Sequence, residues 1–450
     1  MSTPIIWIVL PLIISLILVG LRGRKRLTII LGTITAFILG LLAWRFPFRG
    51  VLVFGPWSIE VLDQMTLFGR RFILEDSDRS ILMAVYFMTA FWFGGAIPAQ
   101  VERVFVPLGL SVVALLVGVI AVNPFIYGAL LIIVAVLLCV PILLPPGQKV
   151  GRGVQRFLVF QLLGMPFILM AGAMLSGMEN HIGDQEIAMQ AIFLLGFGFL
   201  LLMGIFPFHT WVPLLGLENH PYSATFIFST IPSFVALFGL GFLERYEWLQ
   251  TLPGIYNVIS IAGVLMMVLG GLWAALQRHL GRILGFAVIL EIGRFLLAVA
   301  SPLSRSFYES MFLPRTVALG VWALALSLIY KQTRDLSFPA VQGIARSYPI
   351  LGGSLVLAQF TLAGFPLLAG FPLYLTLWQQ LAQDSILLVL WSLVGSAGLL
   401  AGGLRTLAVF VIGPDELTMD ESIPTTIRVL LVIGGVTLVA VGLFPHLFYP

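Results

Sequence analysis

Charged residues are scarce in this chain: Asp, Glu, Lys and Arg make up 10% of its 450 residues, and hydrophobic residues make up 60%. Soluble domains average about 25% charged residues, so this composition excludes an ordinary soluble protein. The apolar residues form repeated stretches of roughly 20 residues, which indicates membrane-crossing helices rather than a barrel. The net charge of +4 fits Lys and Arg flanking such helices and does not indicate binding of nucleic acid.

Cysteine is nearly absent as well. The single one, Cys139, lies inside an apolar stretch, so the sequence offers no disulfide framework. No polar stretch is long enough to fold as a nucleotide-binding or redox-cofactor domain. The sequence also contains no phosphate-binding glycine loop, no Cys/His cluster with metal-ligand spacing and no nucleophile motif. We therefore expect no cofactor, no metal and no catalytic or redox centre within this chain.

About 14 apolar stretches predict an all-α membrane protein in a lipid bilayer. The first stretch is followed, not preceded, by the basic residues at 22–26. This order is the reverse of a signal peptide, so we expect a retained helix with its N-terminus outside the cytoplasmic membrane. The stretches cover residues 4–21, 27–44, 80–99, 104–122, 124–144, 157–176, 188–206, 222–243, 254–276, 282–300, 314–330, 349–379, 385–412 and 428–448.

A short segment outside the membrane is expected between the second and third stretches. Within residues 46–79, two β-like runs at 51–54 and 59–62 flank the sequence Gly55-Pro56-Trp57. Residues typical of strands on either side of a turn dipeptide predict a small β-hairpin.

Two of the predicted helices are interrupted by Gly and Pro. Proline removes a backbone donor, and backbone freed in this way is tolerated in a membrane only where protein or water surrounds it. Broken helices at matching places in two halves are typical of inverted-repeat transporters. The interruptions lie in the seventh and twelfth helices, which are five helices apart. This spacing predicts two inverted five-helix repeats, helices 4–8 and 9–13. The interrupting residues are Pro207 and Pro213 in the first break, and Gly364, Pro366, Gly370 and Pro372 in the second.

The two predicted repeats divide the chain into four units. They are the N-terminal helices 1–3 with the hairpin loop (1–99), the first repeat (100–243), the second repeat (244–412), and an acidic loop with the terminal helix (413–450).

Few titratable residues lie within the predicted spans. Glu291 and Arg294 are three residues apart and share one helical face, so we expect them to pair. They form either a proton relay or a structural ion pair or subunit contact. His209, beside the first break, either exchanges protons near neutral pH or bonds to carbonyls freed by the break.

Three motifs resemble those of the antiporter-like membrane subunits of respiratory complex I, shared with multisubunit sodium/proton antiporters and membrane hydrogenases. GIFPFHTWVP at residues 204–213 is similar to the signature of these subunits. HLGRILGF at 279–286 resembles the "LKRLLAYS" stretch of the tenth helix. LAGFPLLAGF at 362–371 resembles the "LAGIPPLAGF" stretch of the broken twelfth helix.

The resemblance implies a mid-membrane axis of ionisable residues. The family places a glutamate on the fifth helix, lysines on the seventh and eighth, and a lysine or glutamate on the twelfth. In this chain the corresponding positions fall near Ile133, Leu202, Ile231 and Tyr374, so the family's ionisable residues are replaced.

The resemblance therefore implies a membrane-arm subunit of a complex I-like NADH:quinone oxidoreductase, involved in or derived from proton translocation coupled to electron transport. Its partners are then the other membrane subunits of such an assembly. Two alternatives stay open. The chain is a non-conducting scaffold on the same fold, or an independent secondary ion transporter that uses its broken helices as the site.

Overall fold

The computed structural model describes residues 2–54, 57–176, 185–252, 254–301, 303, 305–413 and 423–448. The turn residues Gly55 and Pro56 and most of the acidic loop predicted after residue 413 lie outside this description. Ten helical segments of the described residues are long and apolar enough to cross a membrane. Three shorter apolar helices and α3 (Arg79–Gly94) bring the number of spans to the 14 expected from the sequence.

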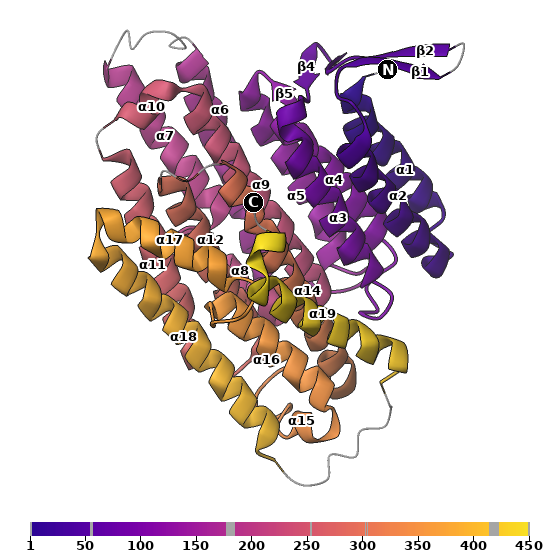
Figure 1. Ribbon diagram of the computed structural model, residues 1–450, viewed down its shortest axis with the longest axis vertical. Helices are drawn as coiled ribbons and strands as arrows, with labels where there is room; N and C mark the ends of the chain where they lie inside the picture. The colour runs from indigo at the N-terminus through magenta and orange to yellow at the C-terminus, as the bar shows by residue number, and fades with distance from the viewer. Residues whose placement is uncertain are drawn as a thin grey trace.

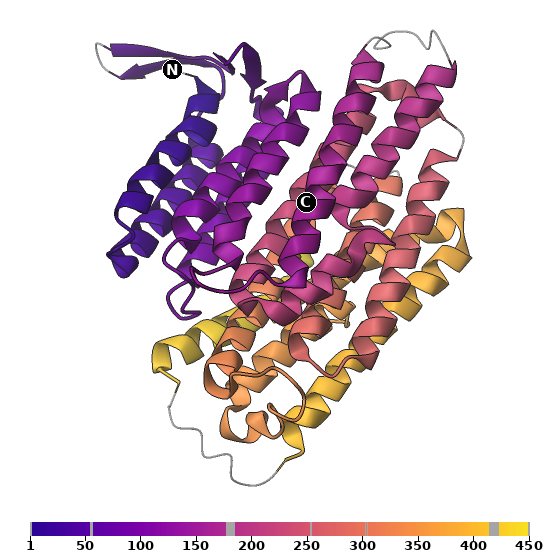
Figure 2. The same ribbon diagram turned by 180° about the vertical axis from the view of Figure 1, so that it is seen from behind.

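The N-terminal helices stand side by side at one edge of the molecule (Figures 1 and 2). The predicted β-hairpin between the second and third helices is confirmed, because β1 and β2 pair in an antiparallel register. A second hairpin, β3 with β4, follows it and adds the short strand β5, which the sequence did not reveal. These elements are η1 (Ile5–Val9), α1 (Leu10–Gly20), α2 (Lys25–Arg45), β1 (Gly50–Phe54), β2 (Trp57–Val61), β3 (Gln64–Leu67), β4 (Arg70–Ile73), η2 (Asp76–Asp78), α3 (Arg79–Gly94) and β5 (Val122–Asn123).

The first bundle contains a helix in two halves, α7 and α8, joined by the irregular segment around η4. In this bundle α4 packs against both α5 and α9. Its elements are α4 (Phe105–Ala121), η3 (Phe125–Tyr127), α5 (Gly128–Leu143), α6 (Arg152–Ser176), α7 (Gln185–Met203), η4 (Phe208–Thr210), α8 (Trp211–Glu218), α9 (Pro221–Arg245) and the short α10 (Glu247–Thr251).

The second bundle repeats this plan with the halves α16 and α17. Here α11 packs against both α12 and α18, as α4 packs against α5 and α9. Its α15 lies at the opposite end of the molecule from the strands (Figure 1). The elements are α11 (Ile255–Leu276), α12 (Leu280–Ala300), α13 (Arg305–Ser310), α14 (Phe312–Thr333), α15 (Ile344–Ser347), α16 (Pro349–Ala363), α17 (Phe371–Asp384) and α18 (Ile386–Val411), followed by α19 (Thr425–Leu443) and η5 (Pro445–Leu447).

Glycines bring the two bundles into backbone contact where α8 crosses the start of α12. A Cβ atom on Gly216 would overlap the carbonyl oxygen of Gly281. A Cβ atom on Gly281 would likewise overlap the carbonyl oxygen of Gly216. Small residues that let backbones approach closely are a main source of helix association in membranes.

We expect Gly281→Ala to lower the free energy of unfolding by about 1 to 3 kcal/mol, because the added methyl group meets backbone that cannot move aside. Thermal unfolding in detergent measures this effect. Gly196→Ala is the matched control, since its Cβ has no neighbour within 4 Å. A Gly281→Ala protein as stable as Gly196→Ala would refute the close contact.

Candidate functional site

The two helix breaks have the same hydrogen-bond geometry. Gly204 and Gly364 both adopt the left-handed conformation, with φ of +65° and +82°. In each break the glycine N–H donates to the carbonyl three residues earlier, and the next N–H donates to the carbonyl five residues earlier. This pattern ends a helix at a glycine and satisfies carbonyls of its last turn. The repeat inferred from the sequence therefore extends to the backbone of the breaks.

A carbonyl left free before each break is capped by a long side chain. In the first break the Gln161 amide on α6 donates to the Leu202 carbonyl, with an N–O distance of 2.7 Å. In the second break the Arg294 guanidinium on α12 donates to the Leu362 carbonyl. The last four carbonyls of a helix have no partner within it, so a buried end requires such caps. One break is thus capped by a neutral group and the other by a charge.

Arg294 belongs to a buried group of side chains at the second break, which we call the Glu291 cluster: Glu291, Arg294, Tyr374 and Ser396. Glu291 and Arg294 are both 0% exposed, and the Arg294 guanidinium donates to the Glu291 carboxylate. Arg294 also donates to the Ser396 hydroxyl on α18 at 3.0 Å. The pairing expected from their spacing is confirmed.

Tyr374 brings the second half-helix into the cluster. Its hydroxyl donates to the Glu291 carboxylate at 3.3 Å. Its ring lies 3.7 Å from the Arg294 guanidinium carbon, a cation–π distance. Tyr374, near the position where the sequence resemblance predicts a lysine or glutamate, therefore contacts both members of the ion pair.

A second buried arginine, Arg315 on α14, lies against α9. Pro232 has no N–H, so it leaves the carbonyl of Phe228, four residues earlier, without its helical partner. Arg315 donates to that carbonyl at 2.8 Å and to the Ser233 hydroxyl at 2.7 Å. Arg315 is 1% exposed, and it interacts electrostatically with Glu291.

The sequence did not reveal Arg315 as a site residue, because the predicted helix 314–330 placed it at the membrane edge. The signal that could have found it is Pro232 within an otherwise unbroken α9, since the freed carbonyl requires a donor from a neighbouring helix. With both arginines and Glu291 ionised, the buried charges sum to plus one. Such charges are expensive in a membrane, and they mark functional sites by default.

The structure does not bring His209 to this cluster. His209 lies in η4 and its ring stacks on Phe206, with the ring centres 5.7 Å apart. Its Nδ1 has no hydrogen-bond partner among the described residues, so this atom does not form the expected bond to a freed carbonyl. None of its described contacts reaches Glu291 or Arg294.

The predicted break residues separate into two groups. Pro207 and Pro366 lie in the irregular segments, Gly364 ends α16, and Gly370 immediately precedes α17. Pro213 and Pro372, in contrast, lie in the first turns of α8 and α17 and do not interrupt them. Proline is tolerated there because the first N–H groups of a helix have no partner within it.

Three of the four positions where the sequence predicts replaced ionisable residues are buried apolar side chains. Ile133, Leu202 and Ile231 lie on α5, α7 and α9 and are 7%, 1% and 0% exposed. A hydrocarbon side chain neither accepts nor donates a proton. Of these four positions, Tyr374 alone is polar, and it belongs to the Glu291 cluster.

His220 lies between α8 and α9, outside the membrane-spanning segments. Burial lowers the pKa of His220 to about 4, assisted by the positive charge of Lys25 and opposed by a hydrogen bond with the Ala99 backbone. An unfolded histidine has a pKa of about 6.5, so between pH 4 and 6.5 the unfolded chain binds more protons than the folded one. The neutral ring therefore contributes its full stability above about pH 6.5, and this contribution is lost as the pH falls toward 4.

We expect the free energy of unfolding to be about 2 kcal/mol lower at pH 5 than at pH 7 because of this residue. His220→Gln, which cannot gain a proton in this range, removes that difference. Thermal unfolding of both proteins in detergent at the two pH values measures it. An unchanged pH dependence in His220→Gln would assign the effect to another group.

Comparison with known proteins gives one family. The pattern of "NADH:quinone oxidoreductase/Mrp antiporter, TM" matches residues 151–412, more than half of the chain. NADH-quinone oxidoreductase subunit N 2 of Acidobacterium capsulatum is 27% identical over 319 residues, which cover 65% of this chain and 64% of that protein. NADH-quinone oxidoreductase subunit N of Maricaulis maris is 28% identical over 199 residues, 42% of this chain and 41% of its own. The matched region thus spans less than two thirds of these relatives.

Two solved structures share the fold over nearly the whole chain. A chain of respiratory complex I from Thermus thermophilus with bound NADH has a TM-score of 0.76 at 19% identity, covering 99% of this chain and 96% of that one. A chain of the Mrp complex from Dietzia sp. DQ12-45-1b has a TM-score of 0.81 at 15% identity, covering 99% and 95%. Together with the paired breaks and the apolar helices, these matches identify a multi-pass integral membrane protein that belongs to the NADH:quinone oxidoreductase/Mrp antiporter transmembrane family.

Proposed function

We propose that this chain is an antiporter-like membrane-arm subunit of a complex I-like NADH:quinone oxidoreductase, and that it takes part in proton translocation coupled to electron transport. It spans the cytoplasmic membrane with its N-terminus outside, and its partners are the other membrane subunits of the assembly. The observation that carries this proposal is the buried Glu291 cluster at the second helix break.

The cluster has the features that a coupling element requires. Glu291, Arg294 and Tyr374 connect α12 with α17, and Arg294 also donates to the Leu362 carbonyl of α16, just before the break. A displacement of α17 relative to α16 therefore changes the environment of Glu291 directly. Charges buried at this depth are costly unless paired, so their balance responds strongly to such a change.

A second candidate, a non-conducting scaffold on the same fold, is favoured by one observation. Ile133, Leu202 and Ile231 are buried hydrocarbon where a continuous proton path through the first bundle needs titratable groups. In this case the ion pair fixes the second break in place, and the bundle seals the membrane between neighbouring subunits.

Purification of the tagged chain from its native membranes tests the assembly. We expect quinone-reductase subunits to accompany it. A lone monomer or homodimer would overturn both the first and the second candidate and favour an independent transporter.

Glu291→Gln in the intact assembly separates the first candidate from the scaffold. We expect electron transfer to continue while fewer protons are translocated per electron, because the neutral amide cannot carry the charge of the carboxylate. The ratio of protons translocated to electrons transferred is measured in reconstituted vesicles with a pH-sensitive dye. Glu102→Gln, at an exposed loop position, is the control that leaves it unchanged. Equal ratios for Glu291→Gln and wild type, with the assembly intact, would support the scaffold.

A further inference from the structure

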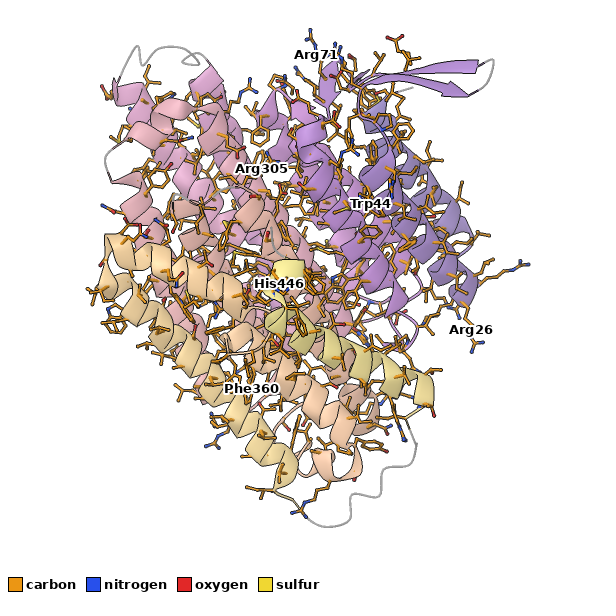
Figure 3. The ribbon with its side chains drawn as sticks, viewed as in Figure 1. Arg26, Trp44, Arg71, Arg305, Phe360 and His446 are labelled. Carbon is orange, nitrogen blue, oxygen red and sulfur yellow. The ribbon has the colours of Figure 1, made fainter. Side chains whose placement is uncertain are left out.

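A cavity of about 310 Å³ opens at the end of α9, between η2, η3 and α13; we call it the Arg305 cavity. Figure 3 shows Arg305 at this junction. Four charged side chains line it, Asp78, Glu244, Arg245 and Arg305, together with the aromatic rings of Phe125 and Phe238. A cavity of this size with charged walls holds water.

Three carboxylates surround Arg305. The guanidinium lies 3.4 Å from Asp78, 3.4 Å from Glu244 and 3.3 Å from Glu309. Burial raises the pKa of Asp78 above its ordinary value. Two acids, Asp78 and Glu244, and two bases, Arg245 and Arg305, line the cavity, so its wall offers water both hydrogen-bond donors and acceptors.

One face of α9 runs from this cavity into the membrane and carries polar side chains at both of its ends. Glu244, Gly241, Leu237, Ser233 and Ser229 follow one another at intervals of three or four residues, and residues so spaced share one face of a helix. At 1.5 Å per residue, the distance along the axis from Glu244 to Ser229 is about 22 Å. This length reaches well into the hydrocarbon region of a membrane.

The facing helices α13 and α14 carry a matching series. Arg305 lines the cavity, and the Tyr308 hydroxyl donates to the Ser233 carbonyl at 3.4 Å. Arg315 then donates to the Ser233 hydroxyl and to the Ser229 carbonyl, the latter at 3.1 Å. The series ends at Arg315, whose guanidinium carbon lies 4.7 Å from the centre of the Phe295 ring, one turn from Glu291 on α12.

A second, small cavity of about 20 Å³ lies beside this point, between α3, α4 and α9. This volume is sufficient for one water molecule, provided that the walls offer polar partners. The walls include Thr89, Ser229, Thr230, Ser233 and Trp92. The Trp92 side chain is 1% exposed, and its Nε1 has no hydrogen-bond partner among the described residues. A buried N–H without a partner is costly, and a water molecule in this cavity would accept its hydrogen bond.

We propose that water enters between α9 and α13–α14, from the Arg305 cavity through the small cavity at Ser233, and reaches Arg315 and the Glu291 cluster. One turn of α9, with Phe234 and Leu237, separates the two cavities, so passage requires these side chains to rotate. Arg315 keeps its positive charge at all physiological pH values. Its charge repels every cation on the path, a hydronium ion included, and the charge of Glu291 offsets part of this barrier.

The role of this path in translocation rests on the proposed function, but its hydration is tested without it. X-ray radiolysis of the purified protein, in whatever assembly it is isolated, produces hydroxyl radicals from bound water that oxidise adjacent side chains. We expect Trp92 to be modified several-fold faster than Trp7. Trp7 is a matched control, since it is 0% exposed and its Nε1 donates to the Leu39 carbonyl. Equal rates for the two tryptophans would overturn the proposal.

The proposed passage of water from the Arg305 cavity to the small cavity is tested by blocking the Arg305 cavity. In a Cys139→Ala background, which removes the chain's single thiol, Leu240→Cys places a thiol on the cavity wall. Reaction with 2-(trimethylammonium)ethyl methanethiosulfonate forms a disulfide and releases methanesulfinate, leaving a bulky group in the cavity. We expect the modification rate of Trp92 to fall to that of Trp7. An unchanged Trp92 rate after complete thiol modification would refute this entrance.

Ser233→Val gives an independent check, because it removes a hydroxyl that lines the small cavity without truncating the side chain. We expect Trp92 modification to fall in this variant, and an undiminished rate would contradict the position of the water. These outcomes differ from a failure of the proposed function, which appears as the absence of quinone-reductase subunits from the purified material.

Discussion

Replacing Arg294 by methionine is expected to lower the free energy of unfolding by about 3 to 5 kcal/mol, the usual cost of removing one partner of a buried ion pair. The change leaves the Glu291 carboxylate with Tyr374 as its neutral hydrogen-bond donor. It also leaves the Leu362 carbonyl and the Ser396 hydroxyl without the donor that Arg294 supplies. Thermal unfolding in detergent, and the yield of folded protein from membranes, measure the loss.

Two further variants show whether this cost arises from the uncompensated charge. Glu291→Gln is expected to destabilise less than Arg294→Met, because the amide oxygen still accepts from both neighbours. The double variant Glu291→Gln/Arg294→Met is expected to be more stable than Arg294→Met alone, because it contains no unpaired buried carboxylate. If the two single effects add, the charges are not coupled, and the ion pair contributes nothing specific to the second break.

The positions of the helix breaks were predictable from the sequence, for a local reason. Glycine adopts the left-handed conformation at no steric cost, and proline cannot donate a hydrogen bond, so both breaks are encoded within about ten residues of chain. The pairing of Glu291 with Arg294 was predictable for the same reason, since it depends only on helical spacing. Pro213 and Pro372 were misassigned because a proline in the first turn of a helix and a proline that breaks one look alike in sequence.

The rest of the cluster depends on contacts between residues distant in sequence. Tyr374 is 83 residues from the carboxylate it contacts, and no local pattern indicates that approach. Arg315 was misplaced because helical structure begins earlier than expected, with α13 at Arg305. At 1.5 Å per residue, the ten residues from Arg305 to Arg315 move its side chain about 15 Å inward from the end of the segment.

Replacing Arg315 by methionine is expected to lower the free energy of unfolding by about 2 to 4 kcal/mol, which is the cost of leaving buried carbonyls without donors and removing a charge that interacts with Glu291. Arg315 is the donor to the Phe228 carbonyl that Pro232 leaves free, and it also donates to Ser229 and Ser233. Arg315→Lys is expected to recover part of the loss, since an ammonium group keeps the charge but lacks the planar fork. Thermal unfolding in detergent measures all three proteins.

Pro232→Ala supplies the decisive control, because alanine restores the N–H that bonds to the Phe228 carbonyl within α9. In that background the carbonyl no longer depends on Arg315, so we expect Arg315→Met to cost about 1 to 2 kcal/mol less than it costs beside Pro232. Equal costs in the two backgrounds would mean that Arg315 acts through its charge alone. A smaller cost in the Pro232→Ala background would establish that a proline in one helix is stabilised by an arginine from another. The contact between Arg315 and the Phe228 carbonyl would then depend on two residues, Pro232 in the first bundle and Arg315 in the second, that lie far apart in sequence.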